Sequence, residues 1–343
     1  MKSKFGNNLY LIAEIGVNHE GSIARAKKMI FDAKNAGAHA VKLQSYKASK
    51  IAAVNSPAYW DLSKESTKSQ YELFSKYDSF TESDYIDLHN YCKKINIDFM
   101  STPFDLDAVE FLDGLVSSFK IASADITNIP LLVRVASKQK PIILSTGCST
   151  VKEIKNALSI LEKNGCPEII LLHCILNYPT NNENANLGMI IDLQKKFPKN
   201  HIGYSDHTLP DSTMSVLQTS YILGCRVIEK HFTDDKLAKG NDHYHSMDKN
   251  DLSNFISKTV FLDGILGDFT KYPLESEKSA ILNARRSIYY NNSIDSGNRI
   301  KENDLISLRP GHGVSPIFFQ KIIGKTLKKS VTKNTPFNWT DVE

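Results

Sequence analysis

Two histidines with the spacing of a paired metal site stand in the second half of the chain. His207 and His231 each close a short apolar run, and one helix-like stretch separates the two runs. If the runs are parallel strands joined by that helix, both imidazoles emerge at the same edge of the sheet. Imidazole is a common ligand of divalent ions, and α/β enzymes place their chemistry at the carboxyl ends of parallel strands. The pair therefore indicates a candidate metal site.

Other polar side chains fall at the ends of similar apolar runs. Lys42 and Lys120 lie within apolar stretches, where lysine is rare without a partner, so a function is favoured for both. The neighbouring acidic, amide and hydroxyl side chains are Glu14, Gln44, Thr102, Ser123, Ser145, Tyr178 and Ser205. Lysine charges and hydroxyl donors together can hold the oxygens of phosphate and carboxylate groups. The set predicts an anion-binding cradle, although a single strand-end hydroxyl more often caps a helix.

Three further histidines are weaker candidates. His173 is flanked by leucines and a cysteine, which favours a buried histidine with satisfied hydrogen bonds. His243 and His245 lie in the segment GNDHYHSMD (240–248). They could be ligands, but their position in a loop favours polar contacts.

Eight short β-like runs alternate with segments of helical period. The runs are residues 9–16, 39–44, 97–102, 118–123, 140–147, 168–174, 201–207 and 226–232. Near-continuous apolar runs of this kind are typical of strands buried on both faces of a parallel sheet. Between the first two runs, Ala26, Met29, Ile30 and Ala33 form one apolar helical stripe. Eight β/α alternations favour a (β/α)8 TIM barrel over an open sheet.

The pattern changes after Gly267. Residues 1–267 form the predicted barrel, 268–283 a linker, and 284–343 a small β-rich domain. A domain of about 60 residues is small enough to depend on packing against a partner. The polar and aromatic-rich insertion 46–82 is expected to be an extended loop that helps cover the active site.

Composition excludes several classes of protein. The hydrophobic fraction of 41% and the charged fraction of 23% are those of an ordinary globular protein. The net charge of +4 comes without a basic block interleaved with aromatic residues, so nucleic acid is not an expected partner. The first apolar stretch is too short for a signal peptide, and no run reaches the ~20 residues of a membrane span. Five scattered cysteines without CxxC spacing indicate a reducing cytoplasm.

Short motifs follow one another along the whole chain. They are IAEIGVNHEGS (12–22), VKLQ (41–44), STPF (101–104), FKIAS (119–123), PIILSTG (141–147), LLHC (171–174), YPT (178–180), GYSDHT (203–208), IEKHFT (228–233), GNDH (240–243) and RPGHGVSP (309–316). In this order they resemble the sialic acid synthase family, the phosphoenolpyruvate-condensing nonulosonate synthases, including the N-acetylneuraminate, legionaminate and pseudaminate synthases. The last motif resembles the arginine loop of the family's C-terminal SAF, or antifreeze-like, domain. The combination is far more specific than any single motif.

The resemblance implies a role for each matching residue. His207 and His231 correspond to ligands of a divalent ion, expected to be manganese, with magnesium or cobalt as alternatives. Glu14 corresponds to a carboxylate beside the reacting carbons, while Tyr178 and Asp242 face the sugar. The residues implied to bind phosphoenolpyruvate are Lys42, Gln44, Thr102, Lys120, Ser123, Ser145 and Ser205.

The resemblance also implies a reaction and an assembly. Phosphoenolpyruvate condenses with the open-chain aldehyde of an N-acylated hexose, such as N-acetylmannosamine or a 2,4-diacetamido-trideoxyhexose. The metal polarises the aldehyde, Glu14 stabilises positive charge at C2 or orients water, and phosphate leaves by C–O cleavage. The product is a 2-keto-3-deoxy-nonulosonic acid. Arg309 corresponds to an arginine that the SAF domain of one subunit inserts into the partner's barrel, which implies a domain-swapped homodimer.

Departures from the family pattern gather where the sugar is expected. Leu176 stands where a small polar residue is common, with Asn177 before Tyr178, and Asn241 replaces a usual proline. The acceptor sugar therefore stays open. A metal-dependent TIM-barrel hydrolase or isomerase is the alternative, but it has no use for the lysine cradle. A third interpretation makes the C-terminal domain a polysaccharide- or ice-binding module, against which Arg309 in a Gly-Pro-rich loop argues.

Overall fold

The computed structural model describes residues 4–6, 8–240 and 242–343, so Asn241 lies outside the described residues. The chain divides into two compact units, Met1–Leu266 and Gly267–Glu343. Each unit has a hydrophobic core of its own.

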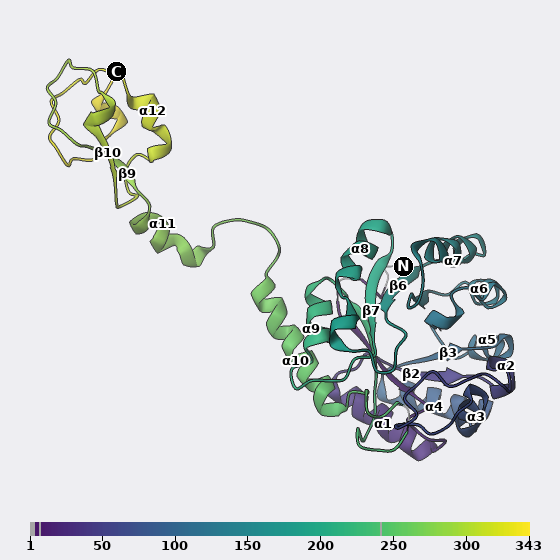
Figure 1. Cartoon of the computed structure of the whole chain (residues 1–343). Coiled ribbons are helices and arrows are strands. Elements are labelled where there is room, and N and C mark those ends of the chain that lie inside the picture. The colour runs from purple at the N-terminus through teal and green to yellow at the C-terminus, as the bar shows by residue number, and fades with distance from the viewer. Residues whose placement is uncertain (1–3, 7, 241) are drawn as a thin grey trace. The chain divides into compact units, whose positions relative to one another are not determined.

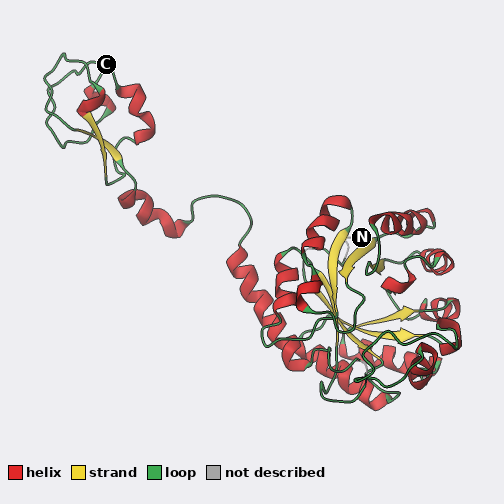
Figure 2. Ribbon diagram, viewed as in Figure 1, coloured by secondary structure: helices red, strands yellow, loops and turns green. Residues whose placement is uncertain are grey.

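The first unit is a parallel barrel ringed by helices (Figure 1, Figure 2). Its strands are β1 (Tyr10–Gly16), β2 (Ala40–Ser45), β3 (Asp98–Pro103), β4 (Phe119–Ile121), β5 (Ile142–Ser145), β6 (Ile169–Cys174), β7 (His201–Asp206) and β8 (Val227–His231). They pair in the order β3-β2-β1-β8-β7-β6-β5-β4, and β3 contacts β4 where the ring closes. The predicted TIM-barrel fold is confirmed.

A helix separates each strand from the next, and one follows the last strand. These helices are α1 (Ile23–Ala36), α4 (Glu82–Ile95), α5 (Leu106–Leu112), α6 (Ile129–Ala136), α7 (Val151–Lys163), α8 (Gly188–Lys196), α9 (Ser215–Ile222) and α10 (Lys249–Leu266). The Ser22 side chain caps the start of α1 by accepting from the Arg25 amide. The predicted stripe of α1 is fully buried, because it packs into the layer between strands and helices.

Successive side chains of a strand point to opposite faces, and this alternation sets the position of the site. In β1, Leu11 and Ala13 face the layer between strands and helices, whereas Tyr10 and Ile12 belong to a separate apolar cluster inside the barrel. Glu14 continues the inward series after Ile12. The barrel interior therefore changes from apolar to polar toward the carboxyl ends of the strands.

The insertion 46–82 is more structured than the extended loop expected from its composition. It contains two short helices, α2 (Ala48–Ile51) and α3 (Gln70–Tyr77). Its aromatic residues explain the difference, because they bury against one another instead of facing water. The Tyr46 and Phe74 rings meet edge to face at 5.4 Å, and buried Trp60 donates its indole N–H to the Glu65 carbonyl.

The second unit is small and β-rich. Strands β9 (Ser287–Tyr290) and β10 (Leu305–Leu308) form an antiparallel pair over a compact apolar core. Helix α11 (Lys278–Ala284) begins within the segment 268–283 that was predicted as a linker and ends one residue beyond it, and α12 (Phe319–Ile322) follows β10. Single 3-10 turns complete the two units: η1 (Ser123–Asp125), η2 (Asn182–Ala185), η3 (Glu275–Glu277), η4 (Glu302–Asp304), η5 (Pro316–Phe318) and η6 (Trp339–Asp341).

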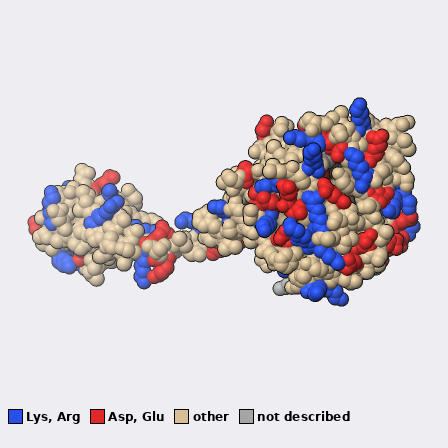
Figure 3. Space-filling view, turned by 90° about the horizontal axis from the view of Figure 1, so that it is seen from below, with Lys and Arg blue, Asp and Glu red and all other residues tan. Residues whose placement is uncertain are grey.

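The surface carries charge of both signs. Acidic and basic side chains are interspersed over the visible face of the barrel unit (Figure 3). Among the described residues, no helix combines the length and the apolar character needed to cross a membrane.

Candidate active site

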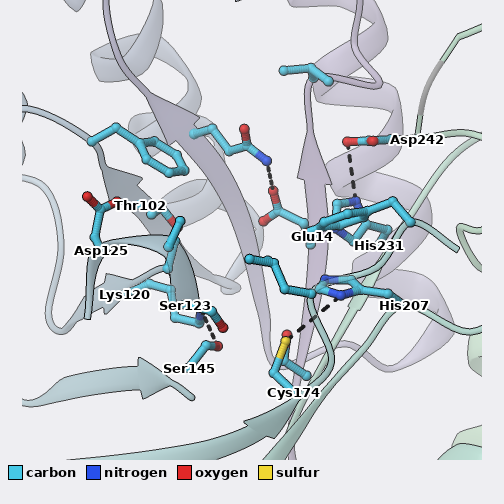
Figure 4. Close-up of a pocket in the computed structure, with 18 of the residues that line it drawn as sticks. Glu14, Thr102, Lys120, Ser123, Asp125, Ser145, Cys174, His207, His231 and Asp242 are labelled. Carbon is cyan, nitrogen blue, oxygen red and sulfur yellow. Dashed lines mark hydrogen bonds and ion pairs between the residues drawn. The ribbon is translucent and has the colours of Figure 1, made fainter. Parts of the chain in front are cut away.

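A cavity of about 680 Å³ lies at the carboxyl ends of the barrel strands (Figure 4). The insertion 46–82 supplies aromatic walls to it, including Tyr59, Trp60 and Phe74. The predicted site residues that line the cavity are Glu14, Lys42, Gln44, Thr102, Lys120, Ser123, Ser145, Tyr178, Ser205, His207, His231 and Asp242. Arg309, the remaining predicted site residue, is an exposed residue of the second unit. The fold thus collects side chains from all eight strands or the turns that follow them.

A buried ion pair forms one part of the cavity floor. Lys42 Nζ lies 2.5 Å from Glu14 Oε2 and donates a hydrogen bond of 2.9 Å to Thr102 Oγ1. The Gln44 amide donates to the other Glu14 oxygen at 3.0 Å. Gly16 leaves space for this carboxylate, since a Cβ there would stand 2.7 Å from Glu14 Oε1. Glu14 is therefore held in one position at the cavity floor.

A second lysine and a second glutamate lie beside this pair. Lys120 Nζ donates to Ser145 Oγ at 2.7 Å and lies 3.7 Å from Glu229 Oε1. Lys42 Nζ lies 3.8 Å from the same Glu229 oxygen, to which the Ser205 hydroxyl donates at 3.4 Å. Glu229 thus lies between the two lysines and offsets part of their charge.

Glu229 was missing from the predicted site residues, and strand alternation could have identified it. Glu229 and His231 are two positions apart on β8, so both side chains face the cavity. Lys230 between them faces away, and its Nζ lies 2.6 Å from buried Asp206. Neither Lys230 nor Asp206 lines the cavity. Lys230 is therefore a structural lysine, unlike Lys42 and Lys120.

Burial and the neighbouring charges separate the pKa values of these groups. Burial raises the pKa of Glu14, and Lys42 offsets this effect only in part. Burial also opposes ionisation of Glu229, but Lys120 and Lys42 hold its pKa below the usual value. Burial lowers the pKa of Lys120. Of the two carboxyl groups, Glu14 is therefore the one that more readily takes up a proton, which suits it to acid–base work.

Ser123 enters the site from a turn and not from a strand end. Strand β4 stops at Ile121, and Ser123 begins η1. Its hydroxyl oxygen accepts from the Gly147 amide at 2.9 Å. This contact ties the end of β4 to the turn after β5 and fixes the hydroxyl beside Ser145, as Figure 4 shows.

The two predicted metal ligands are neighbours in the structure. The His207 and His231 ring centroids are 5.4 Å apart. His207 Nδ1 donates to the Ile175 carbonyl at 2.7 Å, which leaves Nε2 as the ligand nitrogen. Burial lowers the pKa of His207 to about 4 and that of His231 well below its ordinary value. Both imidazoles are therefore neutral near pH 7, the form that binds a metal ion.

The polar atoms around His231 fit a divalent ion. His231 Nδ1 is buried and has no hydrogen-bond partner among the described residues. Asp242 Oδ2 lies 3.5 Å from it. Neutral imidazoles with a carboxylate are a donor set typical of manganese, iron, cobalt and zinc sites. The chemistry of these residues is thus compatible with the predicted metal.

His173 and His243, two of the weaker histidine candidates, make ordinary hydrogen bonds. His173 shares a 2.8 Å hydrogen bond with the Ala185 carbonyl and stacks on Tyr204 within the core, as predicted. His243 Nδ1 lies 2.7 Å from the Thr233 hydroxyl, a polar contact that was also predicted.

The part of the cavity expected to hold the sugar is lined by residues that depart from the family pattern. Leu176 and Asn177 line the cavity beside Tyr178. The Tyr178 carbonyl accepts a hydrogen bond from the Tyr244 hydroxyl at 3.0 Å. The Tyr178 ring centroid lies 4.1 Å from the His207 ring centroid. Burial raises the pKa of nearby Asp242 to about 7. This end of the cavity is therefore rich in groups that could donate to or accept from sugar hydroxyls.

Comparison with known proteins agrees with the resemblance of the motifs. Residues 29–271 match the NeuB family and residues 285–343 match the SAF domain. An uncharacterized protein of Methanocaldococcus jannaschii is 39% identical over 338 residues, covering 98% of this chain and 95% of that protein. The N,N'-diacetyllegionaminic acid synthase of Legionella pneumophila is 35% identical over 341 residues, covering 97% and 94%.

A solved structure gives the same result. The N-acetylneuraminic acid (sialic acid) synthetase of Leptospira borgpetersenii superimposes with a TM-score of 0.71 at 34% identity. The match covers 80% of this chain and 90% of that one. Because the family match spans most of the barrel and the SAF match spans most of the second unit, this chain belongs to the NeuB family and carries a C-terminal SAF domain.

Proposed function

We propose that this protein is a nonulosonate synthase that condenses phosphoenolpyruvate with the open-chain aldehyde of an N-acylated hexose. The products are a 2-keto-3-deoxy-nonulosonic acid and phosphate. The observation that carries the proposal is one cavity in which the Lys42–Glu14 and Lys120–Glu229 groups adjoin His207 and His231. Relatives from Legionella pneumophila and Campylobacter jejuni, both N,N'-diacetyllegionaminic acid synthases, support the reaction class.

In this proposal the lysines bind the phosphoenolpyruvate anion. Lys42 and Lys120 supply positive charge, and the hydroxyls of Thr102 and Ser145, already bonded to them, direct the ammonium groups. Charge-assisted hydrogen bonds of this kind are stronger than neutral ones. Glu229 between the lysines keeps them paired until the anion arrives.

The bond-forming step joins C3 of phosphoenolpyruvate to the aldehyde carbon of the sugar. A divalent ion bound beside His207 and His231, with manganese expected and magnesium or cobalt as alternatives, would supply a Lewis acid for the aldehyde oxygen. Positive charge then develops at C2 of the phosphoenolpyruvate unit, and Glu14 is held at the cavity floor to stabilise it. Water adds at C2 and gives one proton to the oxygen of the former aldehyde. The bond between C2 and the phosphate oxygen then breaks, and the C2 hydroxyl loses its proton to the departing phosphate as the ketone forms.

The proposal extends to the assembly and its compartment. Arg309 would act on the sugar from the SAF domain of a partner subunit in a domain-swapped homodimer, as the family resemblance implies. The cysteines are free thiols, which suits a reducing cytoplasm as the place of the reaction.

Phosphate release tests the reaction. Purified protein is incubated with phosphoenolpyruvate, with and without Mn²⁺, and a panel of sugars that includes N-acetylmannosamine and 2,4-diacetamido-trideoxyhexoses. We expect metal-dependent phosphate release with at least one sugar, together with a 2-keto acid. Absence of phosphate with every sugar would refute the proposal.

A pair of histidine variants tests the metal separately. His231→Ala should abolish turnover, whereas His89→Ala on α4, whose ring packs against Phe99, should leave it intact. Turnover by His231→Ala at the wild-type rate would contradict a catalytic role for a metal ion bound by His231. The hydrolase or isomerase alternative is not favoured, because relatives from Legionella, Campylobacter and Helicobacter are synthases of nonulosonic acids.

A further inference from the structure

A group of three potential metal ligands lies at the edge of the cavity. His231 ends β8, and Asp242 and His245 follow in the loop before α10. One ligand atom from each residue lies within 4.8 Å of the other two, and all three side chains are buried. His245 has no exposed surface.

Distances within the group suit ligands of one ion better than a hydrogen bond. His231 Nδ1 and Asp242 Oδ2 are 3.5 Å apart, longer than the 2.7–3.2 Å usual for N–H···O bonds. Two ligand atoms of a tetrahedral ion with bonds near 2.1 Å stand roughly 3.4 Å apart. The His231 and His245 ring centroids are 4.8 Å apart, close enough for one nitrogen of each to reach a shared ion.

The loop that carries Asp242 and His245 is anchored to the barrel. The Met247 amide donates to the His231 carbonyl at 2.8 Å, and the Thr233 amide donates back to Met247 at 2.9 Å. Ser246 receives a 3.0 Å hydrogen bond from the buried Asn18 amide and donates to the Asp242 carbonyl. These bonds fix the loop backbone on both sides of His245. A ligand set held in this way loses little conformational entropy when it binds an ion.

We propose that His245 and Asp242 bind, together with His231, the divalent ion of the proposed function, on which this assignment rests. Two imidazole nitrogens and one carboxylate oxygen suit Mn²⁺, Co²⁺, Fe²⁺ or Zn²⁺. The ring centroid of His207, the other predicted ligand, lies 5.4 Å from that of His231 and 6.5 Å from that of His245. Binding of the ion then depends on the loop after β8 as well as on the two predicted histidines.

Metal affinity without substrate tests the assignment. Metal-free protein is titrated with Mn²⁺ and followed calorimetrically and by the electron paramagnetic resonance signal of free Mn²⁺. His245→Phe keeps an aromatic ring against Tyr178 and Tyr244 but removes both nitrogens. We expect it to weaken Mn²⁺ binding by at least about tenfold, since even the groups that support metal ligands contribute 10- to 100-fold.

The neighbouring histidine supplies a matched control. His243→Gln retains a hydrogen-bonding side chain next to Thr233, and we expect Mn²⁺ affinity equal to that of the unmodified protein. Asp242→Asn, which keeps the shape of the side chain, should weaken Mn²⁺ binding as His245→Phe does. If His245→Phe does not fold, the Mn²⁺ affinity of Asp242→Asn tests the assignment, and an unchanged affinity would contradict it.

Cobalt spectra give a second readout. Loss of a nitrogen ligand should change the visible absorption of the Co²⁺-loaded His245→Phe protein. Unchanged Mn²⁺ affinity together with an unchanged Co²⁺ spectrum in the folded variant overturns the assignment, even if the protein synthesises a nonulosonic acid. Conversely, His245→Phe could weaken Mn²⁺ binding while the unmodified protein releases no phosphate with any sugar. That result would support these metal ligands and reject the synthase reaction.

Discussion

Lys42 and Glu14 occupy paired positions of β2 and β1, and their side-chain charges meet 2.5 Å apart on the cavity floor. The strand register itself therefore creates the ion pair, because paired residues of neighbouring strands project to the same face. Both side chains are almost fully buried, and breaking such a pair leaves an uncompensated charge. The cavity thus holds its cationic groups in place before an anionic substrate arrives.

Glu14→Gln should separate substrate binding from chemistry. The amide keeps the size of the side chain and its contact with Gln44, but it removes the charge that would stabilise a cation at C2. We expect kcat to fall about 100-fold, as for loss of one preorganised electrostatic group, while the Kd for phosphoenolpyruvate stays equal or decreases. Phosphate-release kinetics and calorimetry measure the two effects. An unchanged kcat would exclude Glu14 from the chemistry, and the surface variant Glu110→Gln provides the control.

Lys120→Met should weaken anion binding without unfolding the barrel. Burial already lowers the pKa of Lys120, and Lys42 still accompanies Glu229 after the substitution. A hydrogen bond to a charged group contributes about 1.5–3 kcal/mol, so the Kd for phosphoenolpyruvate should rise roughly 10- to 100-fold. Calorimetric titration measures the affinity and a thermal melt the stability. Equal affinity in the folded variant would contradict a role in the anion cradle.

Lys230→Met should lower the stability of the protein and leave its affinity for phosphoenolpyruvate unchanged. Lys230 Nζ lies 2.6 Å from Asp206 and 2.7 Å from the Thr208 carbonyl, away from the cavity. Removing it leaves the Asp206 carboxylate buried without its cation, at a cost of about 3–5 kcal/mol in the free energy of unfolding. Urea denaturation measures this loss, while phosphoenolpyruvate affinity of the folded protein should not change. A stability loss below about 1 kcal/mol would contradict a structural role for this lysine.

His19 should make stability depend on pH. Burial lowers its pKa from 6.5 to about 4, and its ring stacks on Phe80. Between these values the unfolded chain binds a proton that the native state excludes, so the free energy of unfolding falls as pH drops through this window. The full effect is about 3 kcal/mol, at about 1.4 kcal/mol per pKa unit.

A variant without the imidazole isolates this effect. His19→Phe keeps the ring stack and removes the titrating group, so its urea midpoint should fall less steeply between about pH 6.5 and pH 4. The other titrating groups are common to both proteins and cancel in the comparison. Equal slopes for the two proteins would assign the acid sensitivity to other groups.

Mixed dimers should reveal whether Arg309 acts across subunits. One subunit carries Glu14→Gln and an intact SAF domain, while the other carries Arg309→Ala and an intact barrel. If the partner's SAF domain completes each site, a purified heterodimer has one complete site and about half of the wild-type rate. Each homodimer should be nearly inactive. An inactive heterodimer, or a monomeric mass during the assay, would contradict the swapped arrangement.

Much of the cavity follows from strand period and order. The apolar runs that end at Gln44 and His231 identify two barrel strands, and parallel β/α alternation brings their carboxyl ends to one mouth. The two-residue alternation of side chains along β8 also predicts which neighbours of His231 face the cavity. Glu229 lies two positions before His231, on the same face of the strand, and faces the cavity. Lys230 lies between them on the opposite face and points away.

Loops and turns limited the sequence-based prediction. The insertion 46–82 was expected to be extended, but its aromatic residues pack into a small folded wall with two helices. Ser123 was placed on a strand, but β4 ends earlier and a 3-10 turn positions the hydroxyl. Such segments have no period, so their contacts depend on what the rest of the fold places beside them.

The amino-acid sequence by itself determined the barrel, the SAF domain and the strand-end residues of the cavity, because periodic burial and family motifs are local properties of the chain. The tertiary structure decided which charged side chains pair. Glu229 lies between Lys42 and Lys120, whereas Lys230 pairs with Asp206 away from the cavity. It also brought His245 to His231. Hydrogen bonds between the loop and β8 create that contact, and no spacing along the chain predicts a loop that returns to its own strand.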